Sequence, residues 1–427
     1  MDNPKASPAG VPFADALRVW GRIGLLSFGG PAGQIALMHR EIVEERGWLS
    51  EKEYLSALNF CMLLPGPEAM QLATYSGWKL HGVKGGLAAG LLFVMPGAII
   101  VLALTMLYAG FGKLPLVEAL FYGVKAAVLA IVLEALLRVA RRALKSRADW
   151  VIAGLAFLAL FAFGLPFPVV IIAAALYGFW RGSGEAEEHK GELPSWRALS
   201  RTLTIWGAIW LVPLAALAML LGPDHVLTQV GVFFSKLAVV TFGGAYAVLA
   251  YMAQAAVERE GWLTAAEMID GLALAETTPG PLILVTQFVG YFAGLREMGT
   301  IWGGIAAAVV TLWMTFAPCF LWIFAGAPYI EAIGKRPRLS GALAAITAAV
   351  VGVILNLSLW FGLHVLFGEV ERLSGWFKPW VPAWGNLDWF ALGLSVVAAV
   401  ALLRFHLGII RTLMLCAVIG AAWKLLV

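Results

Sequence analysis

The segment Leu64-Pro65-Gly66-Pro67-Glu68 decides the fold, because it breaks an apolar stretch that covers residues 54–80. Proline lacks a backbone N–H donor and its ring clashes with the preceding helical turn, so Pro-Gly-Pro cannot continue a helix. In hydrocarbon such a break is tolerated only where it is buried in protein or lines a polar cavity. Since proline suits the first position of a helix, Pro67 is expected to begin a half-helix whose N-terminal amides point into the break.

The same motif occurs twice, because Pro65-Gly66-Pro67 matches Pro279-Gly280-Pro281 at an offset of 214 in sequence position. Two further pairs hold this offset: Ser27-Phe28-Gly29-Gly30 with Thr241-Phe242-Gly243-Gly244, and Gly47-Trp48-Leu49-Ser50 with Gly261-Trp262-Leu263-Thr264. From 27 to 67 the two copies align without a gap, with 15 identities in 41 positions. Beyond this stretch the offset becomes 222, where Pro96 meets Pro318. We interpret the halves as duplicates that diverged by loop insertions.

The composition places the chain in a bilayer. Of 427 residues, 61% are hydrophobic and 13% are charged, whereas soluble proteins have roughly 45–50% apolar and about 25% charged residues. We therefore predict an all-α polytopic membrane protein. At about 20 residues per span, the length allows on the order of a dozen crossings and leaves no room for a large soluble catalytic domain. The sequence contains no phosphate-loop motif, which argues against a nucleotide-driven pump within this chain.

The apolar runs and the loop charges predict the topology. The runs lie at 13–38, 54–80, 85–111, 115–137, 150–164, 166–180, 203–222, 226–255, 265–294, 299–326, 339–367, 387–403 and 405–427. The richest basic loop, residues 138–147, is expected in the cytoplasm, which places the N-terminus inside and the C-terminus in the periplasm, with about 13 crossings. The short runs 150–164 and 166–180 fit either two spans or one re-entrant hairpin.

The crossing count also predicts how the halves are arranged. Seven segments precede the second copy, and an odd number inverts it relative to the first. Inverted-topology repeats are common in secondary transporters, with the substrate site near the midplane. We therefore expect an N-terminal repeat at 1–181, a polar cytoplasmic linker at 182–202, a connecting transmembrane helix at 203–225 and an inverted C-terminal repeat at 226–427.

Three of the basic residues within predicted spans are candidate site residues. Arg22 and Lys236 occupy equivalent repeat positions, and Lys125 lies ten residues into its own segment. An ionisable residue inside a span is by default a candidate functional residue. The alternatives are that Arg22 and Lys236 extend to an interface, and that Lys125 forms a buried pair with Glu118 or Glu134.

Acidic and amide side chains flank the breaks. Glu68 and Glu276 are candidates for proton coupling, although Glu68 also suits a helix cap. Gln71 and Gln287 are candidate donors to ligand oxygens, with helix packing as the alternative. The complete set of candidate substrate-binding residues is Arg22, Ser27, Gly29, Gly30, Pro65, Gly66, Pro67, Gln71, Lys125, Lys236, Thr241, Gly243, Gly244, Thr278, Pro279, Gly280, Pro281 and Gln287. The sequence suggests no cofactor and no metal, and its basic residues mark cytoplasmic loops rather than a nucleic-acid site.

Taken together, Ser27-Phe28-Gly29-Gly30-Pro31, Gly47-Trp48-Leu49, Leu64-Pro65-Gly66-Pro67-Glu68 and the second copies of these motifs closely resemble the chromate ion transporter family, in its long two-domain form. The resemblance implies export of chromate across the bacterial inner membrane, driven by the proton motive force and giving chromate resistance, with sulfate as a competing analogue. One departure is Gln34, where many members have histidine.

Two other functions remain open at this point. One is a permease or antiporter for sulfate or another oxyanion. The other is an intramembrane enzyme that handles lipid phosphate with Arg22, Lys236 and Glu68, but the sequence lacks a nucleophile–base–metal set, so we expect a transporter and not an enzyme. The expected partners are a chromate- or sulfate-type oxyanion and membrane lipids. The oligomeric state stays open, with a homodimer as one option.

Overall fold

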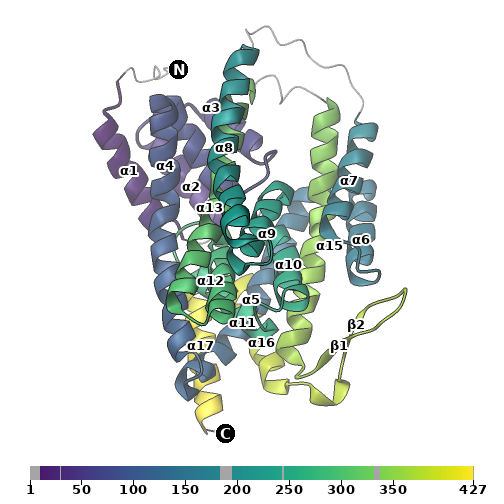
Figure 1. Ribbon diagram of the computed structural model, residues 1–427. Coiled ribbons are helices and arrows are strands. Elements are labelled where there is room, and N and C mark those ends of the chain that lie inside the picture. Colours follow the sequence, from purple (N-terminus) through teal and green to yellow (C-terminus); the bar gives the residue numbers. More distant parts are fainter. Residues whose placement is uncertain (1–9, 29, 183–194, 243–244, 331–336, 427) are drawn as a thin grey trace. The chain divides into compact units, whose positions relative to one another are not determined.

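The computed structural model describes residues 10–28, 30–182, 195–242, 245–330 and 337–426. These residues are almost entirely helical (Figure 1), which confirms the all-α prediction. Within the described ranges, β structure is limited to one antiparallel hairpin, β1 (Val370–Arg372) and β2 (Trp380–Pro382), and an isolated bridge beside it.

The chain forms two compact units, each of which contains segments of both sequence repeats. The first comprises Met1–Ala103, Glu185–Ala245 and Thr278–Arg336, and the second comprises Leu104–Gly184, Tyr246–Thr277 and Pro337–Val427. The spatial units therefore do not follow the boundary between the two halves of the sequence. The expected linker 182–202 lies mostly outside the described residues, and its end is helical because Ser195 caps a helix that begins at Trp196.

The first unit is built from helices of both repeats. It contains α1 (Phe13–Leu26), α2 (Gly30–His39), η1 (Arg40–Glu44), α3 (Glu51–Cys61), most of α4 (Glu68–Phe111), α8 (Trp196–Leu221), α9 (Val226–Val240), η3 (Leu282–Leu284), α12 (Val285–Met298), α13 (Ile301–Gly326) and η4 (Ala327–Tyr329). Helix α13 packs against α8, α9 and α12. Helix α4 is two helices joined at His81 and Gly82, where Gly82 has a φ of 60°. This break separates the predicted runs 54–80 and 85–111.

The second unit shows an exchange of helices between the repeats (Figure 1). It contains the end of α4, α5 (Pro115–Ala143), α6 (Arg147–Phe161), α7 (Phe167–Arg181), nearly all of α10 (Ala245–Gln254), η2 (Ala255–Arg259), α11 (Ala265–Thr277), α15 (Pro337–Leu366), the hairpin, η5 (Trp384–Asn386), α16 (Trp389–Leu403) and α17 (Ile409–Leu426). Helix α5 packs against α16 and α17, whereas α15 packs against α6 and α7. The long helix of each repeat thus lies on the two shorter helices of the other, as expected for copies related by a pseudo-two-fold axis.

The local backbone also repeats at the predicted offset. Gly47 and Gly261 both have positive φ, at 60° and 65°. The hydroxyl of Ser50 caps the backbone N–H of Glu53, and Thr264 does the same for Glu267. Each carboxylate in turn accepts a hydrogen bond from the backbone N–H of the capping residue, so both copies form a capping box. The duplication inferred from the sequence therefore extends to turn and cap geometry.

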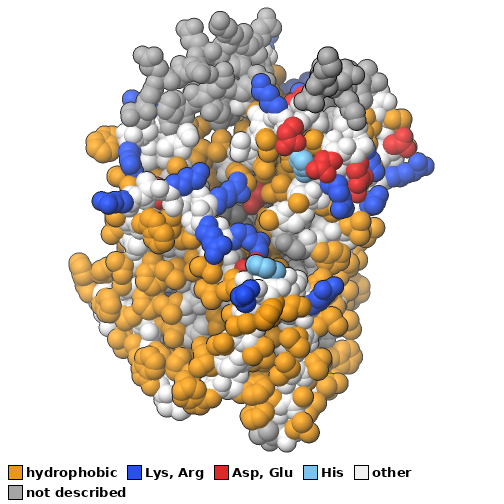
Figure 2. Space-filling model, turned by 180° about the vertical axis from the view of Figure 1, so that it is seen from behind, with side chains coloured by type: hydrophobic (Ala, Val, Ile, Leu, Met, Phe, Trp, Pro, Cys, Tyr) orange, Lys and Arg blue, Asp and Glu red, His pale blue; other side chains and the backbone are white. Residues whose placement is uncertain are grey.

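The surface of the protein is suited to lipid. Six helices of the described chain are long and apolar enough to span a membrane: Glu68–Phe111, Pro115–Ala143, Trp196–Leu221, Ile301–Tyr329, Arg338–Leu366 and Ile409–Leu426. Only 11% of the apolar window of α8 is buried, and Met219 on α8 is 85% exposed. Figure 2 shows hydrophobic side chains over broad areas of the surface, with Lys and Arg in separate patches. A soluble protein does not expose apolar surface on this scale. The protein is a multi-pass membrane protein, and the count of about 13 crossings stays a prediction.

Candidate functional site

The broken segments of the two repeats are joined by a reciprocal pair of hydrogen bonds in the first unit. The backbone N–H of Gly66 donates to the carbonyl oxygen of Thr241 over 2.8 Å, and that of Gly280 donates to the carbonyl oxygen of Ser27 over 2.9 Å. The two donors are equivalent positions of the repeat, and so are the two acceptors. The two hydrogen bonds are therefore equivalent contacts, with the roles of the two copies exchanged. The Pro-Gly-Pro break of each copy is thus tied to the Ser/Thr-Phe-Gly-Gly break of the other.

Glycine is required at these contacts, and beside them on α4, for two reasons. Gly66 and Gly280 have φ values of 118° and 94°, a region that L side chains rarely adopt. Close approach is the second reason, because a Cβ atom on Gly97 would lie 2.2 Å from the carbonyl oxygen of Pro279. Helix α4 therefore meets the second Pro-Gly-Pro motif backbone to backbone at Gly97.

Helix N-termini start at the breaks, as the proline positions predict. Helix α4 begins at Glu68 directly after Pro67, and η3 begins at Leu282 directly after Pro281. Helix α2 begins at Gly30. The first N–H groups of a helix have no partner within the helix and carry partial positive charge, which favours anions. The predicted site residues Gly29, Gly243 and Gly244 lie outside the described residues.

The hydroxyl side chains of the breaks are buried. Ser27 is 0% exposed and Thr241 is 3% exposed, and their hydroxyls donate to the carbonyl oxygens of Ile23 and Leu237. Thr278 is buried in the same unit. Each hydroxyl oxygen keeps acceptor capacity, and rotation of its O–H bond would let it donate to a ligand instead.

Three buried glutamines lie in this unit, of which the sequence predicted two as site residues. Gln71 donates to the carbonyl oxygen of Pro65 over 2.7 Å, and Gln287 is 1% exposed. The third, Gln34, donates to the carbonyl oxygen of Gly280 over 2.6 Å and to that of Ser27 over 3.3 Å. Gln34 therefore bridges the two breaks. From the sequence, Gln34 was noted only as a departure from the family pattern. Its alignment with the apolar Val248 of the second repeat could have marked it as a residue with a special role.

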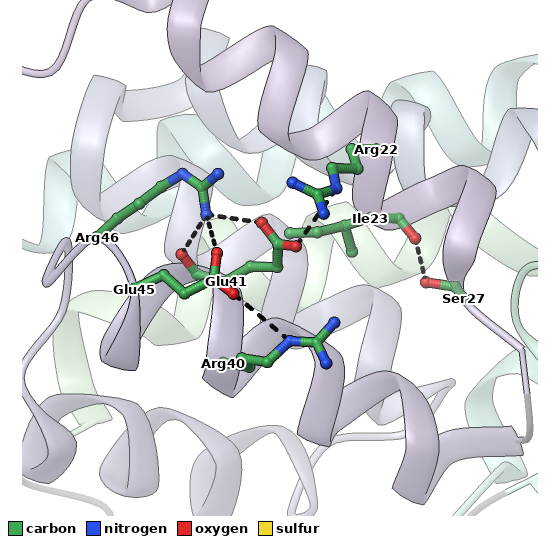
Figure 3. A network of polar contacts seen from close by, with 7 residues as sticks. All are labelled: Arg22, Ile23, Ser27, Arg40, Glu41, Glu45 and Arg46. Carbon is green, nitrogen blue, oxygen red and sulfur yellow. Dashed lines mark hydrogen bonds and ion pairs between the residues drawn. The ribbon is translucent and has the colours of Figure 1, made fainter.

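Of the symmetric cations, Arg22 has a carboxylate partner that the sequence analysis missed. The Nε atom of Arg22 lies 3.6 Å from Oε1 of Glu41, and Nη1 of Arg46 lies 2.6 Å from Oε2 of the same carboxylate (Figure 3). Glu41 is fully buried, so its charge requires such partners. The side chain of Arg22 is 56% exposed and Lys236 is exposed on α9.

In the second unit, Lys125 has a different partner from those weighed on sequence grounds. Its Nζ atom lies 3.4 Å from Oδ2 of Asp270 on α11. Glu134, expected as an alternative partner, pairs instead with Arg138. The pairing of Lys125 with Glu118 or Glu134 was therefore wrong, because residues distant in sequence supply the contact. An ionisable residue inside an apolar run was the available signal for Asp270.

The two candidate proton-coupling residues belong to different units. Glu68 is the first residue of α4 in the first unit and is partly exposed. Glu276, on α11 in the second unit, is 4% exposed and accepts a 2.7 Å hydrogen bond from the hydroxyl of Tyr246. Their roles stay predictions.

Comparison with known proteins gives the family. The chromate transporter family matches residues 14–179 and 228–421, and the starts of these two matches are separated by the repeat offset. The chain belongs to the chromate transporter family.

Named relatives of the family cover most of the chain. It is 33% identical to a chromate transport protein of Pseudomonas aeruginosa over 358 residues, which are 82% of this chain and 81% of the relative. It is 31% identical to the chromate transport protein of Cupriavidus metallidurans, with 78% of each chain covered. A probable chromate transport protein of Synechococcus elongatus is 30% identical, with 83% of this chain and 88% of the relative covered. No solved structure matches the chain.

Proposed function

We propose that this protein transports chromate across the bacterial inner membrane, exporting it from the cytoplasm with the proton motive force as the energy source and thereby conferring chromate resistance. Membership of the chromate transporter family and the names of the relatives support the substrate class. The structural observation that carries the proposal is the reciprocal pair of hydrogen bonds that joins the breaks at Gly66 and Gly280. Broken helices that meet at a repeat interface are where secondary transporters bind substrate.

The joined breaks offer what a tetrahedral dianion requires. Its oxygens accept hydrogen bonds, and the N-termini of α2, α4 and η3 supply backbone donors with partial positive charge. We propose that Arg22 and Lys236 neutralise the dianion, with Glu41 holding Arg22 while the site is empty. The remaining residues of the predicted set stay candidates, including Gln71, Gln287 and Lys125 for the substrate and Glu68 and Glu276 for proton transfer.

The proposal includes the inverted topology. The exchange of helices in the second unit, where α5 packs on α16 and α17 while α15 packs on α6 and α7, supports a pseudo-two-fold relation between the repeats. A two-fold axis in the membrane plane would turn one repeat over relative to the other. We propose a cytoplasmic N-terminus and a periplasmic C-terminus, with the repeats at 1–181 and 226–427.

Uptake of radiolabelled chromate into inside-out membrane vesicles tests this function. We expect uptake that requires the protein and an imposed proton motive force, and that a protonophore abolishes. Excess unlabelled sulfate is the informative competitor, since labelled sulfate taken up faster than chromate would make sulfate the substrate. Vesicles that contain the protein at normal levels but take up neither anion would refute oxyanion transport.

A further inference from the structure

The second unit contains a buried charged cluster that the joined breaks do not use. Asp270 on α11 accepts a 2.7 Å hydrogen bond from the hydroxyl of Tyr108 on α4, through the same Oδ2 atom that faces Lys125 on α5. Asp270 is 3% exposed. Its other oxygen, Oδ1, is buried and has no hydrogen-bond partner among the described residues. A buried carboxylate is thus held at one oxygen and unsatisfied at the other.

This arrangement suits two protonation states of Asp270. The ionised carboxylate is stabilised by Lys125, but its unpaired Oδ1 makes burial of the charge costly. The protonated carboxyl group is neutral, keeps the hydrogen bond from Tyr108 and no longer needs a cation. Among the described residues, the other titratable groups near this cluster are Glu267, whose charge interacts with both Asp270 and Tyr108, and Glu118, whose charge interacts with Tyr108. When ionised, Glu267 adds negative charge beside Asp270.

The cluster is asymmetric with respect to the duplication. Lys125 belongs to the first repeat and is aligned with Thr347 at the offset of 222. Asp270 belongs to the second repeat and is aligned with Ser56 at the offset of 214. Each charged residue therefore has an uncharged hydroxyl residue as its counterpart. A contact needed only to pack the duplicated helices would be expected in both copies, so a charge pair present once indicates a role beyond packing.

We propose that Asp270 binds a proton that accompanies the oxyanion, and that Lys125 is its internal counter-ion. When Asp270 takes up a proton, the ammonium group of Lys125 loses its partner and becomes available to an oxyanion. When the oxyanion leaves, the proton leaves Asp270 and the ion pair forms again. One proton is bound for each dianion, so the complex carries one negative charge, and the electrical component of the proton motive force, negative inside, drives it outward. This inference rests on the proposed transport of an oxyanion and names its proton site.

The pH dependence of anion binding to the purified full-length protein tests the proposal. Sulfate is the main probe because it keeps two charges over the range used, and chromate is measured beside it. In the wild type, binding should weaken by about tenfold per pH unit above the range in which Asp270 titrates, because one proton is taken up with each anion. Asp270→Asn should bind with little pH dependence, since Lys125 is then permanently without its carboxylate.

Asp388→Asn is the matched control. The hydroxyl of Tyr122 donates to Oδ2 of Asp388 over 2.7 Å, the same distance as between Tyr108 and Asp270. Asp388 caps α16 and has no ion-pair partner in the described part of the chain, and asparagine is also a good cap. This control should keep the wild-type pH dependence. If Asp270→Asn fails to reach the membrane, the double variant Asp270→Asn with Lys125→Gln removes both charges, and it should bind weakly at every pH.

The outcomes separate this inference from the function on which it rests. Wild-type pH dependence in Asp270→Asn, or in the double variant, would overturn the proton site while leaving oxyanion binding intact. If the wild type binds neither anion, the proposed function fails, and infrared spectroscopy still tests the proton site. In that measurement, acidification should produce a protonated-carboxyl band that Asp270→Asn lacks and Asp388→Asn keeps. A band of equal size in both variants would refute proton binding at Asp270.

Discussion

Replacing Gly97 with alanine should push α4 away from the second Pro-Gly-Pro break without altering any group that could bind substrate. The new Cβ would lie 2.2 Å from the carbonyl oxygen of Pro279, whereas Cβ contacts below 3.0 Å are essentially never seen. Helix α4 must therefore move relative to the second Pro-Gly-Pro motif. Overpacking of this kind costs roughly 1–3 kcal/mol, against a gain of at most about 1 kcal/mol from replacing glycine within a helix. A displacement of about 1 Å at a binding site can reduce activity by about 100-fold.

Gly110→Ala provides the control on the same helix, because no atom lies within 4 Å of its added Cβ. This variant should be neutral or slightly more stable. Both variants would be assayed for chromate uptake in inside-out vesicles and for thermal stability of the detergent-solubilised protein. We expect Gly97→Ala to be less stable and to lose most uptake at equal membrane levels. If Gly97→Ala transports as well as Gly110→Ala, the close contact between α4 and the second break does not shape the substrate site.

Three further predictions test other parts of the proposal. Reporters fused after Lys145 and after Glu369, the same connection in each repeat, should lie on opposite sides of the membrane, and finding both on one side would remove the inverted-repeat argument. Replacing all of Pro65-Gly66-Pro67 by alanine should favour a continuous helix and abolish uptake while membrane levels stay normal, and undiminished uptake would make the motif a packing feature. Arg22→Gln should raise the half-saturation concentration for chromate by about 10-fold, because a charge-assisted contact contributes roughly 1.5–3 kcal/mol and the 56% exposure of Arg22 places it at the lower end of that range. Arg18→Gln, one turn earlier on α1 and 81% exposed in its side chain, should change it little, and equal effects of the two substitutions would move the anion site away from Arg22.

The sequence alone determined the helical class, the positions of the breaks and the duplication. These features depend on local chemistry, because hydropathy marks spans and proline ends helices wherever the rest of the chain lies. The starts of α4 directly after Pro67 and of η3 directly after Pro281 follow from this local rule. The repeated capping boxes at Ser50 and Thr264 are also encoded within a few residues.

Only the tertiary structure decided which polar groups meet. Lys125 and Asp270 come from different halves of the sequence, and Gln34 of the first half reaches the carbonyl group of Gly280 in the second. Helical periodicity shows which face of a helix is apolar but not which helix covers that face, so it could not predict that α5 packs on α16 and α17. Because burying a charge is costly, a buried charge requires a partner, but this rule does not identify which of several carboxylates that partner is. For Lys125, the packing of α5 against α11 made that choice in favour of Asp270 rather than Glu134.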